Sequence, residues 1–358
     1  MLLLGLAHLH FIYNESVMNP IDMDKTENET TNKANSTLND PHPFKSLEAI
    51  WEHWKHRITT VVATDANLGS PTSKFDAGNR LPSHPFVSGD TFRSMADHLY
   101  DETSSAIKLS DVKPHDVIFI KSDMAAGFCT NVFPQLQVPI IMLSHNSDDG
   151  FPRAPECTGI IDQVKLTYWM GQNLMVAMRP KLLPVPIGLA NRYWSHGDIH
   201  VVAARARQFK SFMDRDILVY MNFGSTTSAR GQIAQMVKDH IPEATAVTQK
   251  KSYAEYLEDL SRSKFVVSPL GNGLDCHRTW ESLLMGAIPI VESSTLNPLY
   301  EGLPVMIVSD YKSLTKELLD LFLKKLPMRF TERSLDKLFS AYWQAKIVEL
   351  KAQAQSSE

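Results

Sequence analysis

The chain has 358 residues, of which 43% are hydrophobic and 21% charged, so it is long enough for two domains with full cores. Its formal net charge of −4, with lysines and arginines scattered along the chain, argues against nucleic acid as a partner. No stretch approaches the ~20 consecutive apolar residues that a transmembrane helix requires.

The first 40 residues differ in composition from the rest of the chain. Residues 1–13 are apolar but short, and two interpretations are open: a truncated signal anchor, or a frayed tail. Residues 14–40 are rich in Asn, Thr and Glu and nearly free of aromatic side chains, which predicts a disordered tail or stem. This segment holds three N-glycosylation sequons, at Asn14, Asn28 and Asn35.

From residue 44 onward, apolar runs alternate with amphipathic and loop-like segments. In the first half we expect helices at 44–57, 92–100 and 199–212, strands at 59–63, 116–121 and 138–143, an extended run at 181–189, and a long loop at 65–85. The strands lack a clean alternation of polar and apolar residues. We therefore expect a parallel sheet that is covered on both faces.

Two of these strands end in polar residues that suit a general base. Asp123 follows the strand at 116–121, and His145 and Asp148 follow the strand at 138–143. A hydroxyl nucleophile needs a nearby base to take its proton, and each of these three side chains qualifies. A histidine beside an aspartate also suits a metal site or the cap of a turn, so these alternatives stay open.

The second half of the chain shows the same alternation. We expect strands at 216–222, 244–248, 264–268, 287–291 and 304–309, and helices at 232–240, 253–261, 275–285, 313–325 and 331–354. The expected organisation is a tail or stem at 1–43, one α/β domain at 44–213, a second at 214–330, and a C-terminal helix at 331–358.

The first strand of the second half ends in residues that suit a phosphate. Asn222 closes this strand, and a glycine, several hydroxyl residues and Arg230 follow. The alternative is an ordinary helix N-terminus capped by Ser228. We favour the phosphate, because this loop is expected to open at the same edge as the glycine loop at 270–275.

The glycine loop is the most informative stretch of the chain. Gly271 and Gly273, on either side of Asn272, allow a backbone to approach a ligand closely. Asp275 is expected to cap the helix that follows, and Gly286 is expected to end it. The alternative is that these glycines only shape a turn between a strand and a helix.

Two charged residues on the following helix complete the expected site. Arg278 and Glu281 share a polar face one turn apart, where the arginine fork suits two phosphate oxygens and the carboxylate suits two ribose hydroxyls. This combination predicts a site for a nucleotide sugar. The alternative is an exposed ion pair between the two side chains.

The same stretch carries a resemblance to a known family. The sequence SPLGNGLDCHRTWE at 268–281, followed by GAIPIV at 286–291, resembles the C-terminal half of exostosin-like glycosyltransferases. The resemblance implies the GT-B fold, in which two doubly wound, Rossmann-like domains face a cleft and C-terminal helices follow. This chain differs from the animal exostosins at Asn272, Leu274 and Asp275, where those proteins have basic residues.

The resemblance implies a transferase that moves a sugar from a nucleoside diphosphate, expected to be UDP, to a hydroxyl of a glycan or glycoprotein with inversion. The donor site is then formed by the residues Asn222, Ser228, Arg230, Gly271, Asn272, Gly273, His277, Arg278, Glu281 and Glu292. Glu292 is expected near the base or ribose. Trp194 either stacks on a sugar or packs between domains.

The resemblance also bears on cofactors, location and the competing function. No Asp-x-Asp motif stands in a catalytic position, so we expect no metal and no cofactor.

An apolar start, a stem and a catalytic body is the layout of Golgi transferases anchored as type II membrane proteins, although a cytoplasmic location stays open. A non-catalytic sugar-nucleotide-binding protein, or an accessory subunit of another transferase, is the alternative function.

The three cysteines leave two interpretations. Cys129, Cys157 and Cys276 show no spacing typical of a metal site. A disulfide between Cys129 and Cys157 is compatible with a lumenal protein, and three buried thiols are equally compatible with the pattern.

Overall fold

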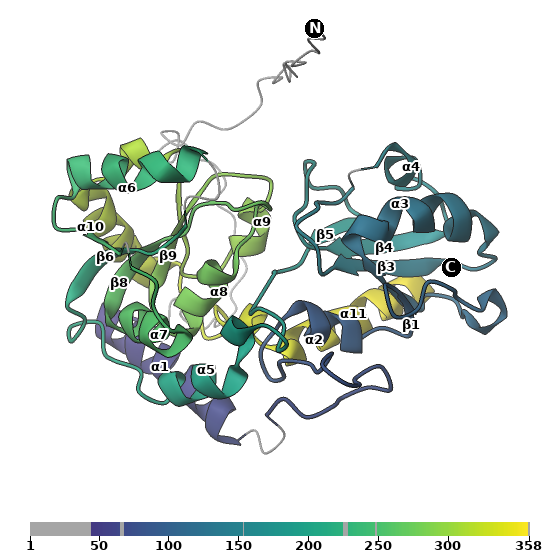
Figure 1. Ribbon diagram of the computed structural model, residues 1–358, viewed down its shortest axis with the longest axis horizontal. Coiled ribbons are helices and arrows are strands. Elements are labelled where there is room, and N and C mark those ends of the chain that lie inside the picture. Colours follow the sequence, from purple (N-terminus) through teal and green to yellow (C-terminus); the bar gives the residue numbers. More distant parts are fainter. Residues whose placement is uncertain (1–43, 65–67, 153, 225–227, 248, 357–358) are drawn as a thin grey trace, which may run out of the picture. The chain divides into compact units, whose positions relative to one another are not determined.

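The structure is a computed structural model that describes residues 44–64, 68–152, 154–224, 228–247 and 249–356 (Figure 1). The expected stem, its apolar start and its three sequons lie outside the described residues. The described residues all belong to one compact unit. Among the helices of the described ranges, none combines the length and the apolar character needed to cross a bilayer.

The first sheet has five parallel strands in the order in which they occur in the chain. They are β1 (His98–Tyr100), β2 (Val117–Lys121), β3 (Ile140–His145), β4 (Leu166–Gly171) and β5 (Leu182–Pro184). All six residues of β3 and the first four of β2 are buried. This burial on both faces explains why their sequences are continuous apolar runs. Short helices α3 (Ala125–Gly127) and α4 (Pro155–Thr158) lie along the connections.

The second sheet also has five parallel strands, in the order β10-β9-β8-β6-β7. They are β6 (Ile217–Met221), β7 (Thr245–Ala246), β8 (Ser263–Val267), β9 (Ile288–Glu292) and β10 (Met306–Val308). From strand β6 the chain first adds β7 on one side and then β8 on the other. The carboxyl ends of β6 and β8 therefore form a topological switch point, where open α/β sheets bind ligands. The predicted α/β class with two parallel sheets is confirmed.

Helices flank the second sheet. They are α5 (Ile199–Ala206), α6 (Ser228–His240), α7 (Tyr253–Arg262), α8 (His277–Leu284), α9 (Asn297–Tyr300) and α10 (Lys316–Lys325). Helices α6, α7 and α10 agree with the predicted segments to within a few residues. The predicted helix at 199–212 ends earlier, at Ala206.

The predicted strand at 59–63 is wrong, because these residues form the end of helix α1 (Leu47–Thr64). Trp51, Trp54, Ile58 and Val62 are all at most 1% exposed, at spacings that place them on one side of the helix. This buried stripe extends through the β-branched run TTVVA. Helical periodicity over four turns outweighs the local strand preference of five residues.

Two further elements differ from the prediction. The expected helix at 92–100 is replaced by helix α2 (Gly89–Ser94), capped by Ser88, and by strand β1. Strand β4 was not predicted at all, although LTYWMG is an apolar run that ends in the polar residues Gln172 and Asn173.

The two ends of the described chain pack away from their neighbours in sequence. The indole nitrogens of Trp51 and Trp54, in α1, donate to the carbonyls of Gly286 and Leu283 at the end of α8. The last helix, α11 (Ser340–Ser356), starts later than the predicted residue 331 and lies along the first sheet (Figure 1). Its Lys351 forms an ion pair with Asp97 beside β1. Helix α1 thus packs on the second half of the chain and helix α11 on the first.

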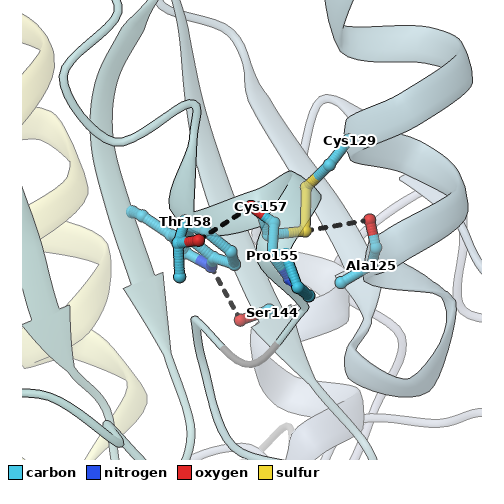
Figure 2. The surroundings of a disulfide bond; sticks show 7 residues. Ala125, Cys129, Ser144, Pro155, Cys157 and Thr158 are labelled. Atoms are coloured by element: carbon cyan, nitrogen blue, oxygen red, sulfur yellow. Dashed lines mark hydrogen bonds between the residues drawn. A yellow bond between two sulfur atoms is a disulfide. The ribbon is translucent and has the colours of Figure 1, made fainter.

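A disulfide joins Cys129, in the helical segment after α3, to Cys157 in α4 (Figure 2). The two Cα atoms lie 5.3 Å apart and 28 residues apart in sequence. Cys276 is a free cysteine. Of the two interpretations that the sequence left open, the structure has the disulfide.

Candidate functional site

Helix α8 begins at the switch point of the second sheet. Its N-cap is Cys276, and Gly286 ends it with a φ of 73°, a conformation that glycine adopts without strain. The predicted cap by Asp275 is wrong, because this carboxylate is engaged elsewhere. The first turn of α8 thus directly follows the loop from β8, as the sequence predicted.

Arg278 lies between the carboxyl ends of β6 and β8. Its Nε donates to the carbonyl of Asn222 at 3.1 Å, and its guanidinium carbon lies 5.5 Å from the centre of the Phe223 ring. Among the described residues no carboxylate lies within 4 Å of this guanidinium, so the expected alternative of an ion pair with Glu281 does not occur. Its Nη1 also donates to Cys276 Sγ at 3.8 Å, so the guanidinium is held at two points and Nη2 makes no hydrogen bond to the described residues.

Arg230, in the first turns of α6, joins Arg278 at this point. The residue is 8% exposed, and its guanidinium donates to the carbonyls of Leu270 at 2.7 Å and Pro269 at 3.0 Å. Burial lowers the pKa of Arg230, and the charge of Arg278 lowers it further, which shows that the two cations are close. Two nearby positive charges at a switch point form a strongly anion-attracting position.

The predicted neighbours of these arginines are arranged around them. The side-chain amide of Asn222 donates to the hydroxyl of Tyr220 at 2.9 Å, and its backbone carbonyl accepts from Arg278. Ser228 is the first residue of α6, and its side chain lies outside the description. A Cβ atom on Gly271 would lie 3.1 Å from Arg230 Nη2, so a glycine is favoured there.

Glu281 is placed differently from the prediction. It is 4% exposed, and its carboxylate accepts hydrogen bonds from Tyr253 at 3.1 Å and Tyr256 at 2.9 Å, both on α7. Burial raises the pKa of Glu281. The face of α8 that carries Glu281 therefore packs on α7 instead of lining an open gap, because the tyrosine hydroxyls satisfy the carboxylate.

Glu292 ends strand β9, two strands away from β6 in the sheet. It is partly buried, and its pKa is raised by burial and by the nearby carboxylate of Asp310. The structure records no direct contact between Glu292 and either arginine, so this residue lies at the margin of the site.

The glycine loop contacts the carboxyl edge of the first sheet. Asn272 Nδ2 donates to Asp148 Oδ2 at 3.0 Å, and the backbone N–H of Asp275 donates to Asn173 Oδ1 at 2.8 Å. A Cβ atom on Gly273 would lie 2.4 Å from Asn173 Nδ2, a distance that side chains do not tolerate. Gly273 is therefore required for this close approach.

Asp275 links the two sheets through its side chain. Its Oδ2 accepts from the backbone N–H of Ile187 and from the Trp280 indole, both at 2.8 Å, and Oδ1 accepts from Cys276 N–H and the Tyr300 hydroxyl. Burial raises the pKa of Asp275 to about 6. All four donors converge on one carboxylate, which explains why it does not cap α8.

A cavity of about 250 Å³ lies where these loops meet. Strand ends of the first sheet, the segment after β5 and the start of α8 supply its lining residues: Gly89, His145, Asn146, Ser147, Asp148, Gln172, Ile187, Leu189, Asn191, Tyr193, Trp194 and His277. Two of the three predicted base candidates, His145 and Asp148, thus share a cavity with the predicted donor residue His277.

The two histidines of this cavity are neutral near physiological pH. Burial lowers the pKa of both His145 and His277 to about 4. In His145 both ring nitrogens are engaged, since Nε2–H donates to the Pro186 carbonyl at 3.0 Å and Nδ1 accepts from Asn146 N–H at 2.7 Å. His277 donates from Nδ1 to the Gly188 carbonyl at 2.7 Å, which leaves Nε2 as an acceptor.

Asp148 and Asp123 have different surroundings. Asp148 is exposed and lines the 250 Å³ cavity, with Oδ2 accepting from Asn272. Asp123 forms an ion pair with Lys121 at 3.1 Å and lines a separate cavity of about 300 Å³ beside the disulfide. The structure thus separates Asp123 from the other base candidates.

Trp194 is 54% exposed at the edge of the cavity, stacked at 6.1 Å on the His196 ring. This exposure contradicts the alternative that the indole packs between domains. It leaves an aromatic face accessible to a ligand.

Gln172 and Asn146 are polar cavity residues that were not predicted as site residues. Gln172 and Asn146 directly follow β4 and β3, and Asn146 adopts a φ of 63° that is uncommon outside glycine. Asn146 is held there by hydrogen bonds with Asp90 and Asn191. Recognising the run at 166–171 as a strand would have placed Gln172 at the same sheet edge as His145.

No group of three or more His, Cys, Asp or Glu side chains that suits a metal ion occurs among the described residues.

Comparison with known proteins places the arginine site in a recognised domain. Residues 223–318 match the RXYLT1 C-terminal domain. The match spans about a quarter of the chain and includes Arg230, the glycine loop and all of α8. It supports the resemblance to glycosyltransferases and, in general terms, sugar transfer.

Matches that cover more of the chain come from solved structures. The curated protein sequences contain no significant match. The solved structures include α,α-trehalose 6-phosphate synthase from Burkholderia multivorans, at 10% identity over 75% of this chain and 77% of that chain, with a TM-score of 0.41. They also include an α1,3-fucosyltransferase with GDP-fucose, at 12% identity over 71% of this chain and 94% of that chain, with a TM-score of 0.33.

Proposed function

We propose that the chain is a GT-B glycosyltransferase that moves a sugar from a nucleoside diphosphate, expected to be UDP, to a hydroxyl of a glycan or glycoprotein. The observation that carries this proposal is the position of Arg278. Its guanidinium lies at the switch point of a parallel sheet, beside a second arginine and with no carboxylate within ion-pair distance in the described chain. A diphosphate is the anion that this pair of cations suits best.

In this proposal the diphosphate lies against Arg278 and the first turn of α8, with the backbone of Gly271 beside it. Arg230 holds the loop from β8 through two carbonyls and adds positive charge. Cations and the N-terminus of a helix stabilise the negative charge that develops on the leaving diphosphate. We propose that this replaces a metal ion, and that no cofactor takes part.

Asp148 is the base that we favour. It is exposed in the cavity beside the donor loop, whereas His145 has both ring nitrogens engaged. A carboxylate that takes the proton of the acceptor hydroxyl supports direct displacement with inversion. Asn272 orients the carboxylate through Oδ2, so Oδ1 is the oxygen assigned to the proton.

We further propose a location in the lumen of the secretory pathway, with a membrane anchor preceding the stem. The disulfide between Cys129 and Cys157 supports an oxidising compartment. Sensitivity of the expressed full chain to an N-glycan-removing enzyme would test this location through the three sequons.

The deciding experiment combines calorimetry with a transfer assay on the purified chain. UDP binding together with hydrolysis or transfer of a UDP-sugar supports the enzyme. UDP binding without either reaction supports the alternative, a sugar-nucleotide-binding or accessory protein. Absence of nucleotide binding would reject both.

A further inference from the structure

The 250 Å³ cavity contains a buried polar group without a partner. Gln172 lines the cavity and is 2% exposed, and its Oε1 has no hydrogen-bond partner in the described structure. Native proteins rarely leave such an atom unsatisfied, because losing its hydrogen bond to water is costly. Because the residue lines the cavity, a rotation of the carboxamide toward the cavity lets a ligand supply the missing hydrogen bond.

The other polar groups of the cavity define the chemistry of that ligand. Asp148 is an acceptor, and so is the unprotonated Nε2 of His277, whose Nδ1–H is donated to Gly188. No lysine or arginine is among the residues that line the cavity. A lining of neutral polar groups and one carboxylate, without a cation, suits hydroxyl groups and disfavours carboxylates or phosphates.

The cavity also has an aromatic face and a rigid wall. Trp194 is half-exposed at its edge, and an indole face suits the apolar side of a sugar ring. The wall around Asn146 is fixed by hydrogen bonds to Asp90 at 3.0 Å and to Asn191 at 2.8 Å. Non-glycine residues held at positive φ cluster at ligand sites.

We propose that this cavity is a subsite for an uncharged sugar ring stacked on Trp194, and that Gln172 is a specificity-determining residue that binds one of its hydroxyls. This inference rests on the proposed function, and it assigns the substrate class of that site. The ring is either the sugar of the donor or that of the acceptor, since both present hydroxyl groups.

The test measures binding by calorimetry for the wild-type chain, Gln172→Met and the control Ser83→Ala. Ser83 also has a buried, unpartnered side-chain oxygen, but it does not line the cavity. The probes are UDP, UDP-glucose, UDP-galactose, UDP-xylose and UDP-glucuronic acid. We expect a neutral sugar to add affinity over UDP, and Gln172→Met to reduce that gain by roughly three- to tenfold without changing UDP itself.

A second arm identifies the source of the ring. If no neutral UDP-sugar binds more tightly than UDP, methyl glycosides of the same sugars are titrated onto the chain with and without UDP. Gln172→Met should then weaken glycoside binding by a similar factor, which assigns the cavity to the acceptor. Equal sugar affinity in the wild type and Gln172→Met in both arms, or tightest binding of the glucuronic acid donor, would overturn the inference.

Folding is monitored separately. Because the Gln172 oxygen has no partner, Gln172→Met should unfold at or above the wild-type temperature, as should Ser83→Ala. If Gln172→Met does not fold, Gln172→Asn, which withdraws the same amide by one methylene, provides the binding test. Failure of UDP to bind the wild type would reject the proposed function. The glycoside titrations would still show whether the cavity binds a sugar ring.

Discussion

Replacing Arg278 with alanine tests the anion site most directly. In the structure Nε donates to the Asn222 carbonyl and Nη1 makes a long contact with Cys276 Sγ at 3.8 Å, so Nη2 and the second N–H of Nη1 remain for phosphate oxygens. A hydrogen bond to a charged group contributes about 1.5–3 kcal/mol, so Arg278→Ala should weaken UDP binding by roughly 10- to 150-fold. Calorimetry with UDP at constant ionic strength measures this change.

Two companion variants separate the fork from the charge. Arg278→Lys keeps the positive charge but loses the contact to Asn222 and the two-pronged geometry, so it should recover only part of the affinity. Arg262→Ala removes an arginine that is paired with Asp216 on the surface, and it should change UDP affinity less than twofold.

Stability provides the second half of this test. Arg278 contributes hydrogen bonds to Asn222 and Cys276 and a contact with the Phe223 ring but no ion pair, so Arg278→Ala should cost about 2 kcal/mol of unfolding free energy. UDP affinity that stays at the wild-type value in a folded Arg278→Ala protein would refute the assignment of this arginine to the donor.

Three further predictions concern the base, the buried carboxylate and the disulfide. Asp148→Asn should lower the transfer rate about a hundredfold or more while UDP affinity stays constant, and an unchanged rate would remove Asp148 as the base. Burial raises the pKa of Asp275 from 3.8 to about 6, so the folded state binds this proton more tightly than the unfolded state does. The resulting stabilisation of about 3 kcal/mol is fully present below pH 3.8 and is lost as the pH rises through 6. In urea titrations the stability of the wild type relative to Asp275→Asn should therefore fall by up to this amount between pH 4 and pH 7; a constant difference would contradict the burial argument. Replacing Cys129 and Cys157 together with serine should lower the free energy of unfolding by about 3.5 kcal/mol, given their 28-residue separation, and a thermal transition equal to that of the wild type would disprove a stabilising bridge.

Much of the fold follows from local sequence. The runs at 117–121, 140–145 and 288–292 are strands because continuous apolar residues suit a sheet that is buried on both faces. Helix α7 has a complete capping box at Ser252, and Gly286 ends α8. These features depend on residues a few positions apart.

The failures have a common cause. TTVVA at 59–63 has a strand preference, yet it is helical because the buried stripe begun by Trp51 continues through it and packs against the end of α8. Asp275 has the residue type and position of a helix cap, but two donors from distant segments, Ile187 and Tyr300, share its carboxylate. Long-range contacts of this kind outweigh local preference.

The sequence by itself determined the α/β class, the glycine loop and the place of Arg278 at the start of a helix, because each depends on local spacing. Only the tertiary structure decided the strand order that creates the switch point, the burial of Glu281 against two tyrosines, and the meeting of Asp148 with Asn272. Those features join residues 25 to more than 100 positions apart, and no local pattern encodes which distant donor reaches which acceptor.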